Sequence, residues 1–372
     1  MTQRGKAEGG SRRLAPAGAA FALLGLGLFA YFVWRAGPAE IWANVSKIGW
    51  GFAAILLLGG LRFVVRAFAW TLCFEPPHRL KFRDAFGAFL IGDAAGNIVP
   101  LGMVVSEPTK LAVVRDRVPL VAALSAIAVE NIFYMLSVAL FISCGAAALL
   151  ATFPLPKALR LSSYGIIAGA LVVLGLAAYA LRRQWRLLTA ALDRAAARGL
   201  GRRAHARRRE RVAAFEDRLY GFYERRRARF LPLVLCEAAF HLLGVAEAYL
   251  TIALISGAAP TLLSAFLLES AGRVINVVFK FVPLRAGVDE LGTGQVARLL
   301  TFGETAGVTL AIVRKARTLF WMTIGVALLA ARGVSLRDVA AGAEPAPGAP
   351  LGEAQPKSGV WTETPRAGSI DS

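Results

Sequence analysis

Long apolar runs alternate with short polar segments along most of this chain. Six runs are long enough to cross a bilayer, because a membrane helix needs about 20 mainly apolar residues. They cover residues 17–34, 49–72, 119–150, 163–181, 230–255 and 305–331. The composition agrees, with 56% hydrophobic residues and a mean hydropathy of +0.56. The pattern predicts an all-α polytopic membrane protein with about six spanning helices and a membrane domain over residues 17–331.

Two further apolar segments, residues 82–106 and 262–290, are interrupted by Gly, Pro, Asn and acidic residues. The first holds Asn97, Pro100 and Gly102 before Glu107, and the second holds Asn276, Pro283 and Gly287 before Glu290. Glu follows Pro by seven positions in both, so one unit is used twice. Helix breakers occur at membrane depth where the backbone is buried in protein or lines a cavity. We therefore predict two broken, re-entrant hairpins.

The first run follows a basic N-terminal segment, residues 1–16, an arrangement also typical of a signal peptide. The run is long, lacks a convincing cleavage site and ends in Tyr31 and Trp34, aromatic residues of the type that anchor a helix at an interface. We expect an uncleaved span that leaves residues 1–16 in the cytoplasm.

Positive charge is concentrated in one segment. The chain has a formal charge of +19, and residues 182–229 alone contain 16 basic and 5 acidic residues. Lys and Arg gather on the cytoplasmic side of membrane proteins, where they also attract anionic lipid headgroups. We predict a cytoplasmic loop of amphipathic helix near the membrane surface. Nucleic-acid binding is the alternative, but no recognised fold or aromatic interleaving accompanies the charge, and no nucleic-acid partner is expected.

Following the positive charge assigns each segment to a side of the membrane. Basic residues flank the first interrupted segment at both ends, whereas the linker before the second, residues 256–260, is uncharged and is placed outside. The two hairpins then enter from opposite faces. A first repeat at about 49–150 and a second at about 230–331 are therefore inverted, which is the plan of secondary transporters.

The last residues, 332–372, are rich in Pro, Gly and Ala without periodicity, which is typical of a disordered tail. We place this tail and the N-terminus in the cytoplasm and the protein in a bacterial cytoplasmic (inner) membrane.

A charged residue follows each hairpin at a similar distance. Glu130 comes 23 positions after Glu107, and Arg314 comes 24 positions after Glu290. A charge at bilayer depth costs about 2.5–3.5 kcal/mol on insertion scales, so both side chains are expected to face protein or water. The alternatives are a charge that snorkels to an interface, or a Glu130–Arg314 pair that holds the repeats together.

Other polar residues of the apolar runs are expected to find internal partners, because buried charges are usually paired. Arg62 and Arg66 are predicted to pair with Glu237 and Glu247, with headgroup binding as the alternative. His241 follows Glu237 by four positions, so both lie on one helix face and favour a hydrogen-bonded pair over a metal site. The three Cys and three His show no ligand spacing, so neither a metal nor a cofactor is expected.

These motifs resemble the transmembrane region of lysylphosphatidylglycerol synthetases and the wider flippase-like membrane family. The resemblance covers residues 14–331 and rests on Pro100-Leu-Gly102 with Glu107 and Lys110, Ala128-Val-Glu130-Asn131, Pro283-Leu-Arg-Ala-Gly287-Val-Asp-Glu290 and Ala311-Ile-Val-Arg314-Lys-Ala-Arg317. The second motif of that family typically reads Pro-Gly-Gly-x-Gly-x-x-Glu. Here Arg285 replaces a Gly, Asn131 takes a place often held by Arg, and the first motif lacks the usual glycines.

The resemblance implies movement of a lipid, either a phospholipid or an isoprenoid lipid, between leaflets. On this view Arg273, Lys280 and Arg314 meet the phosphate, and the cavity is also lined by Glu107, Glu130 and Glu290. The bifunctional synthetases carry a soluble aminoacyl-transferase domain after the membrane part, and no such segment is seen here. We therefore expect no catalytic residues and no enzyme activity.

Two other classes stay open. A membrane enzyme acting on a lipid-linked substrate is expected to show a metal or substrate signature on a loop outside the membrane, and none is seen. A non-transporting partner of a lipid or glycolipid synthesis complex, docking through its Arg-rich loop, is the second. The sequence identifies neither the lipid nor the oligomeric state.

Overall fold

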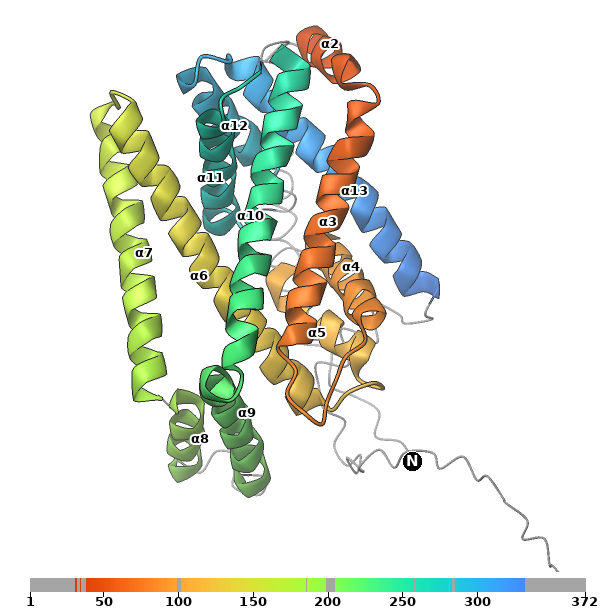
Figure 1. The fold of residues 1–372 in the computed structure, drawn as a ribbon, viewed down its shortest axis with the longest axis vertical. Helices are drawn as coiled ribbons and strands as arrows, with labels where there is room; N and C mark the ends of the chain where they lie inside the picture. Colours follow the sequence, from red (N-terminus) through yellow and green to blue (C-terminus); the bar gives the residue numbers. More distant parts are fainter. Residues whose placement is uncertain are drawn as a thin grey trace, which may run out of the picture.

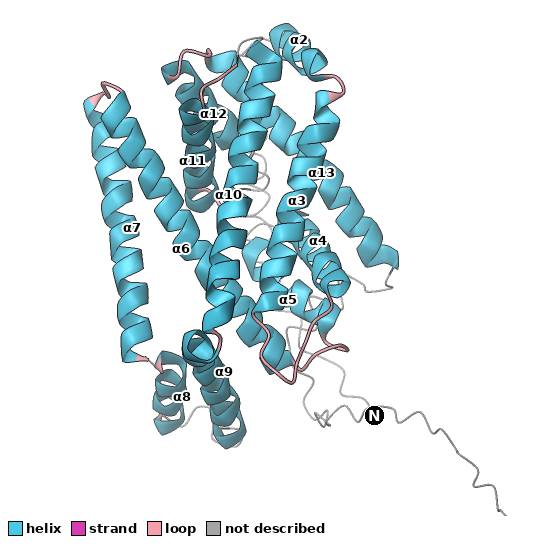
Figure 2. Cartoon of the chain, in the orientation of Figure 1, coloured by secondary structure: helices cyan, strands magenta, loops and turns pink. Residues whose placement is uncertain are grey.

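The computed structural model describes residues 31, 34, 38–98, 102–184, 186–198, 205–256, 259–280, 282 and 285–331. Within these residues every regular element is a helix, and no strand occurs (Figures 1 and 2). The predicted all-α architecture is confirmed. The predicted N-terminal segment, most of the first run, Pro100, Pro283 and the predicted tail lie outside the described residues.

Two sets of helices build the bundle, and a surface pair joins them. The first set is α2 (Pro38–Ile48), α3 (Gly51–Leu72), α4 (Phe82–Ile98), α5 (Gly102–Val114), α6 (Leu120–Thr152) and α7 (Lys157–Arg183). The surface pair is α8 (Leu187–Ala197) and α9 (His205–Arg225). The second set is α10 (Arg227–Ser256), α11 (Leu262–Val278), α12 (Val288–Leu299) and α13 (Glu304–Ala331).

Among the described residues, four helices are long and apolar enough to cross a membrane: α3, α6, α7 and α10. They coincide with four of the six predicted runs, and the chain is a polytopic membrane protein. The last predicted run forms α13, whose 28 residues extend about 42 Å at 1.5 Å per residue. Arg314, Lys315 and Arg317 lower its hydropathy, and all three pair with carboxylates of neighbouring helices.

The arrangement of the helices repeats itself. The central helices α3 and α10 run antiparallel and pack side by side. Each is followed by a hairpin, α4–α5 or α11–α12, and then by a long helix, α6 or α13. The two hairpins enter the bundle from opposite ends (Figure 1). This packing agrees with the predicted inverted repeat.

The two repeats also interlock. The first helix of each hairpin packs against the last helix of the other repeat, α4 against α13 and α11 against α6. Small residues allow both contacts, because Gly325 of α13 meets the backbone of Leu90, and Gly145 of α6 meets Ser270 of α11. Each repeat therefore supplies the surface that covers the other repeat's hairpin.

Within the first hairpin, α4 and α5 approach at the backbone level. A Cβ atom at Gly102 would overlap the carbonyl group of Gly96, so this crossing leaves no room for a side chain. The glycine of the first motif is explained by this close approach. Residues 99–101, which join the two helices, lie outside the described part of the chain.

We predict that Gly325→Ala destabilises the fold, because the added methyl group meets the backbone of α4. Overpacking of this kind costs about 1–3 kcal/mol. The matched control is Gly169→Ala in α7, where a Cβ atom meets nothing within 4 Å. That substitution is expected to be neutral or stabilising by up to about 1 kcal/mol, because Ala favours helix over Gly. Thermal unfolding in detergent measures both, and equal melting temperatures for the two variants would contradict the interlocked packing.

The opposite orientation of the hairpins predicts a topology. Ser256 ends α10 at one end of the bundle, and Ala197 ends α8 at the other (Figure 1). Cysteines introduced at these positions, in a chain whose native cysteines are replaced, are expected to react with an impermeant reagent from opposite sides of the membrane. Labelling of both from the same side would rule out this topology.

Candidate functional site

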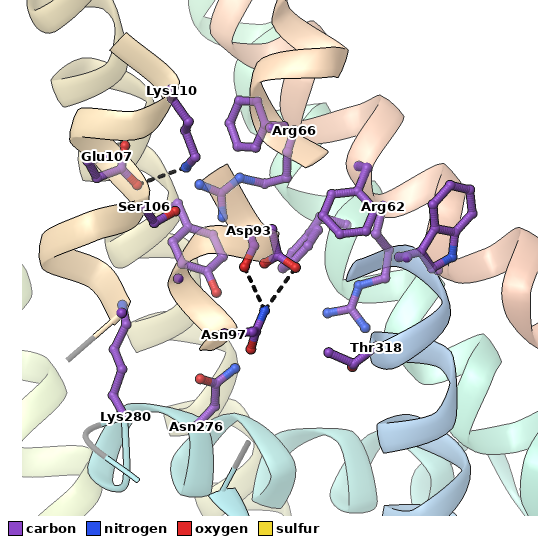
Figure 3. Close-up of a pocket in the computed structure, with 18 of the residues that line it drawn as sticks. Arg62, Arg66, Asp93, Asn97, Ser106, Glu107, Lys110, Asn276, Lys280 and Thr318 are labelled. Atoms are coloured by element: carbon purple, nitrogen blue, oxygen red, sulfur yellow. Dashed lines mark hydrogen bonds and ion pairs between the residues drawn. The ribbon is translucent and has the colours of Figure 1, made fainter. Parts of the chain in front are cut away.

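A polar cavity of about 300 Å³ lies where the two hairpins approach each other (Figure 3). Asn97 near the end of α4 and Asn276 near the end of α11 both line it, so the end of each hairpin's first helix reaches the same space. Arg62 and Arg66 of α3 and Thr318 of α13 line it from the long helices. The cavity is therefore shared by both repeats.

The wall of this cavity is strongly cationic. Its lining includes two acidic residues, Asp93 and Glu107, and seven basic residues, Arg62, Arg66, Lys110, Arg273, Lys280, Arg285 and Arg317. Charges in a low-dielectric interior are costly unless they are paired, so the partners of these cations decide which of them is available to a ligand.

Arg66 is held by Glu130 of α6. Its guanidinium donates to both carboxylate oxygens, Nε to Oε1 at 2.5 Å and Nη2 to Oε2 at 2.9 Å, and Glu130 is fully buried. The guanidinium carbon also lies 3.8 Å from the ring centroid of Tyr134. This two-pronged pair fixes Arg66 in one orientation at the cavity wall.

Glu247 of α10 joins α3 and α13. It accepts from Nη1 of Arg62 at 3.4 Å and from Nη1 of Arg317, and its carboxylate is fully buried. Because Arg62 and Arg317 belong to different repeats, this one carboxylate ties the repeats together beside the cavity.

Glu269 of α11, like Glu247, is a carboxylate shared by several arginines beside the cavity. It accepts from Arg273 at 2.6 and 2.9 Å and from Arg314 of α13 at 2.6 Å. Arg62 lies 3.6 Å away, which links this cluster to Glu247. A continuous ion-pair network thus runs through α3, α10, α11 and α13.

The second motif forms the start of α12. Gly287 has φ +81°, and its N–H donates to Oε2 of Glu290 at 2.8 Å, while Lys315 of α13 donates to Oε1. Arg285 also adopts a left-handed backbone, with φ +48°, and Nε pairs with Asp289 at 3.2 Å. A left-handed backbone favours glycine, so Arg285 stands at a position whose backbone suits the Gly that the resemblance leads us to expect there.

Lys280 differs from the other six cations. Each of those six has a carboxylate partner, whereas no hydrogen bond or ion pair of Lys280 is found among the described residues. Its side chain is exposed, and Figure 3 shows it extending from the α11 end toward the first hairpin. Lys110 by contrast donates to Glu107 at 2.8 Å.

Asp93 is the acidic counterpart of Lys280. It accepts only from the side-chain amide of Asn97, at 3.0 Å, among the described residues, with no cation in ion-pair contact. Oε2 of Glu107 is buried and has no hydrogen-bond partner among the described residues. The cavity therefore offers one uncompensated ammonium group and two carboxylate groups to a ligand.

The structure separates the six predicted substrate-binding residues into two groups. Glu107, Arg273 and Lys280 line the cavity. Glu130 and Glu290 do not line it but are fully buried in ion pairs. Arg314 lines an adjoining cavity of about 70 Å³. Of the predicted motif residues, Asn97, Gly102 and Asn276 line the cavity, whereas Gly287 begins α12.

Several predicted pairings need correction. The alternative Glu130–Arg314 pair is wrong, because each residue is paired within its own repeat, Glu130 with Arg66. Arg62 does pair with Glu247, as predicted. Among the described residues no hydrogen bond joins Glu237 to His241, and both lie at hydrogen-bond distance from the hydroxyl of Ser137. The predicted pairing of Glu237 with Arg62 or Arg66 is wrong, because these arginines pair with Glu247 and Glu130.

Sequence reasoning missed Asp93 and Glu269. Both are acids in the middle of apolar helices, which is the same signal that singled out Glu130. Asp93 also precedes Asn97 by one helical turn, the spacing at which two side chains meet on one face. Within the described residues, no group of three potential metal ligands is present.

The Arg66–Glu130 pair supports a prediction. Glu130→Gln leaves the buried Arg66 charge without its carboxylate and is expected to destabilise the protein by about 3–5 kcal/mol. The control is Asp193→Asn, which breaks an exposed pair with Arg209 and should cost less than about 1 kcal/mol. Chemical unfolding in detergent measures both, and a loss of similar size in the two variants would show that burial does not set the strength of this pair.

Comparison with known proteins identifies the family. Residues 18–326 match the family model described as the lysylphosphatidylglycerol synthase TM region. No curated protein and no solved structure gives a significant match to this chain. The matched range contains both hairpins, the ion-pair network and the whole lining of the polar cavity. The chain is therefore a membrane protein related to lipid metabolism, and it belongs to the lysylphosphatidylglycerol synthase TM region family.

Proposed function

We propose that this protein moves a phosphate-bearing membrane lipid between the leaflets of a bacterial inner membrane, with the headgroup passing through the polar cavity between the hairpins. The family relates the chain to lipid metabolism, and the cavity suits the headgroup of an anionic lipid. The protein acts here as a transporter and not as an enzyme.

The observation that carries this proposal is the unpaired ammonium group of Lys280 in a cavity whose other cations are neutralised. A phosphate oxygen supplies the anion that Lys280 lacks, and a charge-assisted hydrogen bond of this kind is stronger than one between neutral groups. Arg62 and Arg273 also line the cavity, and a guanidinium group has five N–H donors, so each can donate to a phosphate while it keeps its carboxylate partner.

The hairpins supply a reason for access from both leaflets. They enter from opposite ends, and the ends of α4 and α11 line one cavity. Movement of one hairpin relative to the other opens this cavity toward one end or the other, as in transporters built from inverted repeats. The acyl chains stay in hydrocarbon while only the headgroup enters the polar space.

The surface pair α8–α9 fits binding to anionic lipid headgroups on the cytoplasmic side. Arg194, Arg198 and Arg211 are exposed on it. The pair is attached to the bundle because Arg225 of α9 donates to Glu75 at 3.0 Å. A basic surface attached to the bundle in this way attracts anionic lipids to its edge.

We predict that Lys280→Gln slows lipid exchange by about tenfold to a hundredfold, because a hydrogen bond to a charged group is worth about 1.5–3 kcal/mol. The measurement is leaflet exchange of fluorescent phosphatidylglycerol in liposomes that contain the purified protein. Lys280→Arg keeps the charge and should retain most of the activity. Lys157→Gln, at an exposed site at the start of α7, is the matched control.

Equal exchange rates in wild type and Lys280→Gln would remove Lys280 from the lipid path. Absence of exchange by the wild-type protein for anionic and isoprenoid lipids alike would favour the second candidate, a non-transporting partner of a lipid synthesis complex.

A further inference from the structure

A second cavity, of about 940 Å³, lies between α6, α7, α9 and α10, apart from the polar one. Aliphatic and aromatic side chains form most of its lining, with Leu140 of α6 and Leu174 and Ala177 of α7 among them. Among the described residues that line it, none is a Lys or an Arg. Its volume is within the range of about 300–1,000 Å³ that is typical of small-molecule sites.

Three polar residues interrupt this apolar lining at one place. The hydroxyl oxygen of Ser137 lies 3.2 Å from Oε2 of Glu237 and 3.1 Å from Nε2 of His241. The ring of Phe141 stacks on His241 with a centroid distance of 4.4 Å and an interplanar angle of 11°. The trio therefore has a fixed geometry inside a hydrophobic cavity.

The trio is incompletely satisfied. Oε1 of Glu237 and Nδ1 of His241 are buried, and neither has a hydrogen-bond partner among the described residues. The two residues are only 3% and 5% exposed. An unmade hydrogen bond at a buried group is unfavourable, so a ligand that completes both would be favoured at this place.

The charges around the cavity favour a ligand with a neutral polar group over one with an anionic headgroup. An anionic headgroup would face the carboxyl group of Glu237 without a cation in the cavity wall, whereas the polar cavity offers such cations. A hydroxyl group is neutral, can donate to Oε1 of Glu237, and can accept from His241 in the tautomer that carries the proton on Nδ1 and accepts from Ser137 at Nε2. Its hydrocarbon chain matches the apolar lining along α6 and α7.

We propose that this cavity binds a neutral, hydroxyl-bearing lipid, either a long-chain alcohol or a diacylglycerol, with the hydroxyl at Ser137, Glu237 and His241 and the hydrocarbon between α7 and α10. The site is separate from the proposed lipid path, because none of its lining residues lines the polar cavity. It holds a second class of lipid on the same protein.

The test is photolabelling of the purified full-length protein in nanodiscs with a diazirine analogue of hexadecanol, followed by peptide mapping. We expect saturable labelling of α6, α7 or α10, competed by hexadecanol or by dioleoylglycerol but not by hexadecane or palmitate. Competition by hexadecanol alone identifies a single-chain alcohol, and competition by dioleoylglycerol identifies the two-chain lipid. Equal competition by hexadecane, or none by either hydroxyl-bearing lipid, overturns the proposal.

Two variants separate the hydrocarbon site from the polar trio. Ala177→Trp fills the cavity and should abolish saturable labelling, whereas Ala178→Trp, at the neighbouring exposed position outside the lining, should leave it unchanged. Glu237→Gln keeps the shape of the trio and should weaken competition by hexadecanol about threefold to tenfold, as expected for one hydrogen bond. Unchanged labelling in Ala177→Trp, with folding verified by thermal unfolding, contradicts the site.

The Lys280→Gln variant, which is expected to slow lipid exchange, tests whether the two cavities are independent sites. Lys280→Gln should leave alcohol labelling unchanged, because Lys280 does not line the apolar cavity. Loss of labelling in that variant would show that the two cavities are not separate sites. The outcome for exchange and the outcome for labelling are therefore distinguishable.

Discussion

The cost of charge in a low-dielectric interior is the constraint on which this bundle depends. Among the described residues, six of the seven cations that line the polar cavity are neutralised by carboxylates, and two of those carboxylates, Glu247 and Glu269, join helices of different repeats. The same ion pairs that make a cationic cavity tolerable thus also hold the repeats together. A ligand anion is left with Lys280, because the remaining charges are committed to the fold.

Much of the architecture follows from the sequence because its physical basis is local. Apolar runs of sufficient length predict spanning helices, and Pro or Gly at membrane depth predicts breaks. Five of the six predicted long helices and both hairpins are found where expected, and most of the first predicted run lies outside the described residues. The pairing of charges is not local. Arg66 and Arg62 lie one turn apart on α3, and only the packing of α6 and α10 decides that the first meets Glu130 and the second Glu247.

The candidate site was predictable in part for the same reason. The sequence predicts Asn97 and Asn276 at the breaks, and both line the cavity. Glu107 and Glu290 both follow a Pro by seven positions, but only Glu107 lines the cavity. Glu290 instead caps its own helix, because the N–H of Gly287 donates to its carboxylate. Sequence spacing identifies polar residues at membrane depth, and the backbone conformation decides whether they face a ligand or the protein.

Each hairpin packs against the last helix of the other repeat, and this has a consequence for the order in which the protein is made. The groove that α4 occupies is completed by α13, the last described helix of the chain, and the surface that α6 offers to α11 stays uncovered until the second repeat is made. Until the second repeat is made, Arg62 of α3 therefore lacks both of its carboxylate partners, Glu247 and Glu269, whereas Arg66 already has Glu130 of α6.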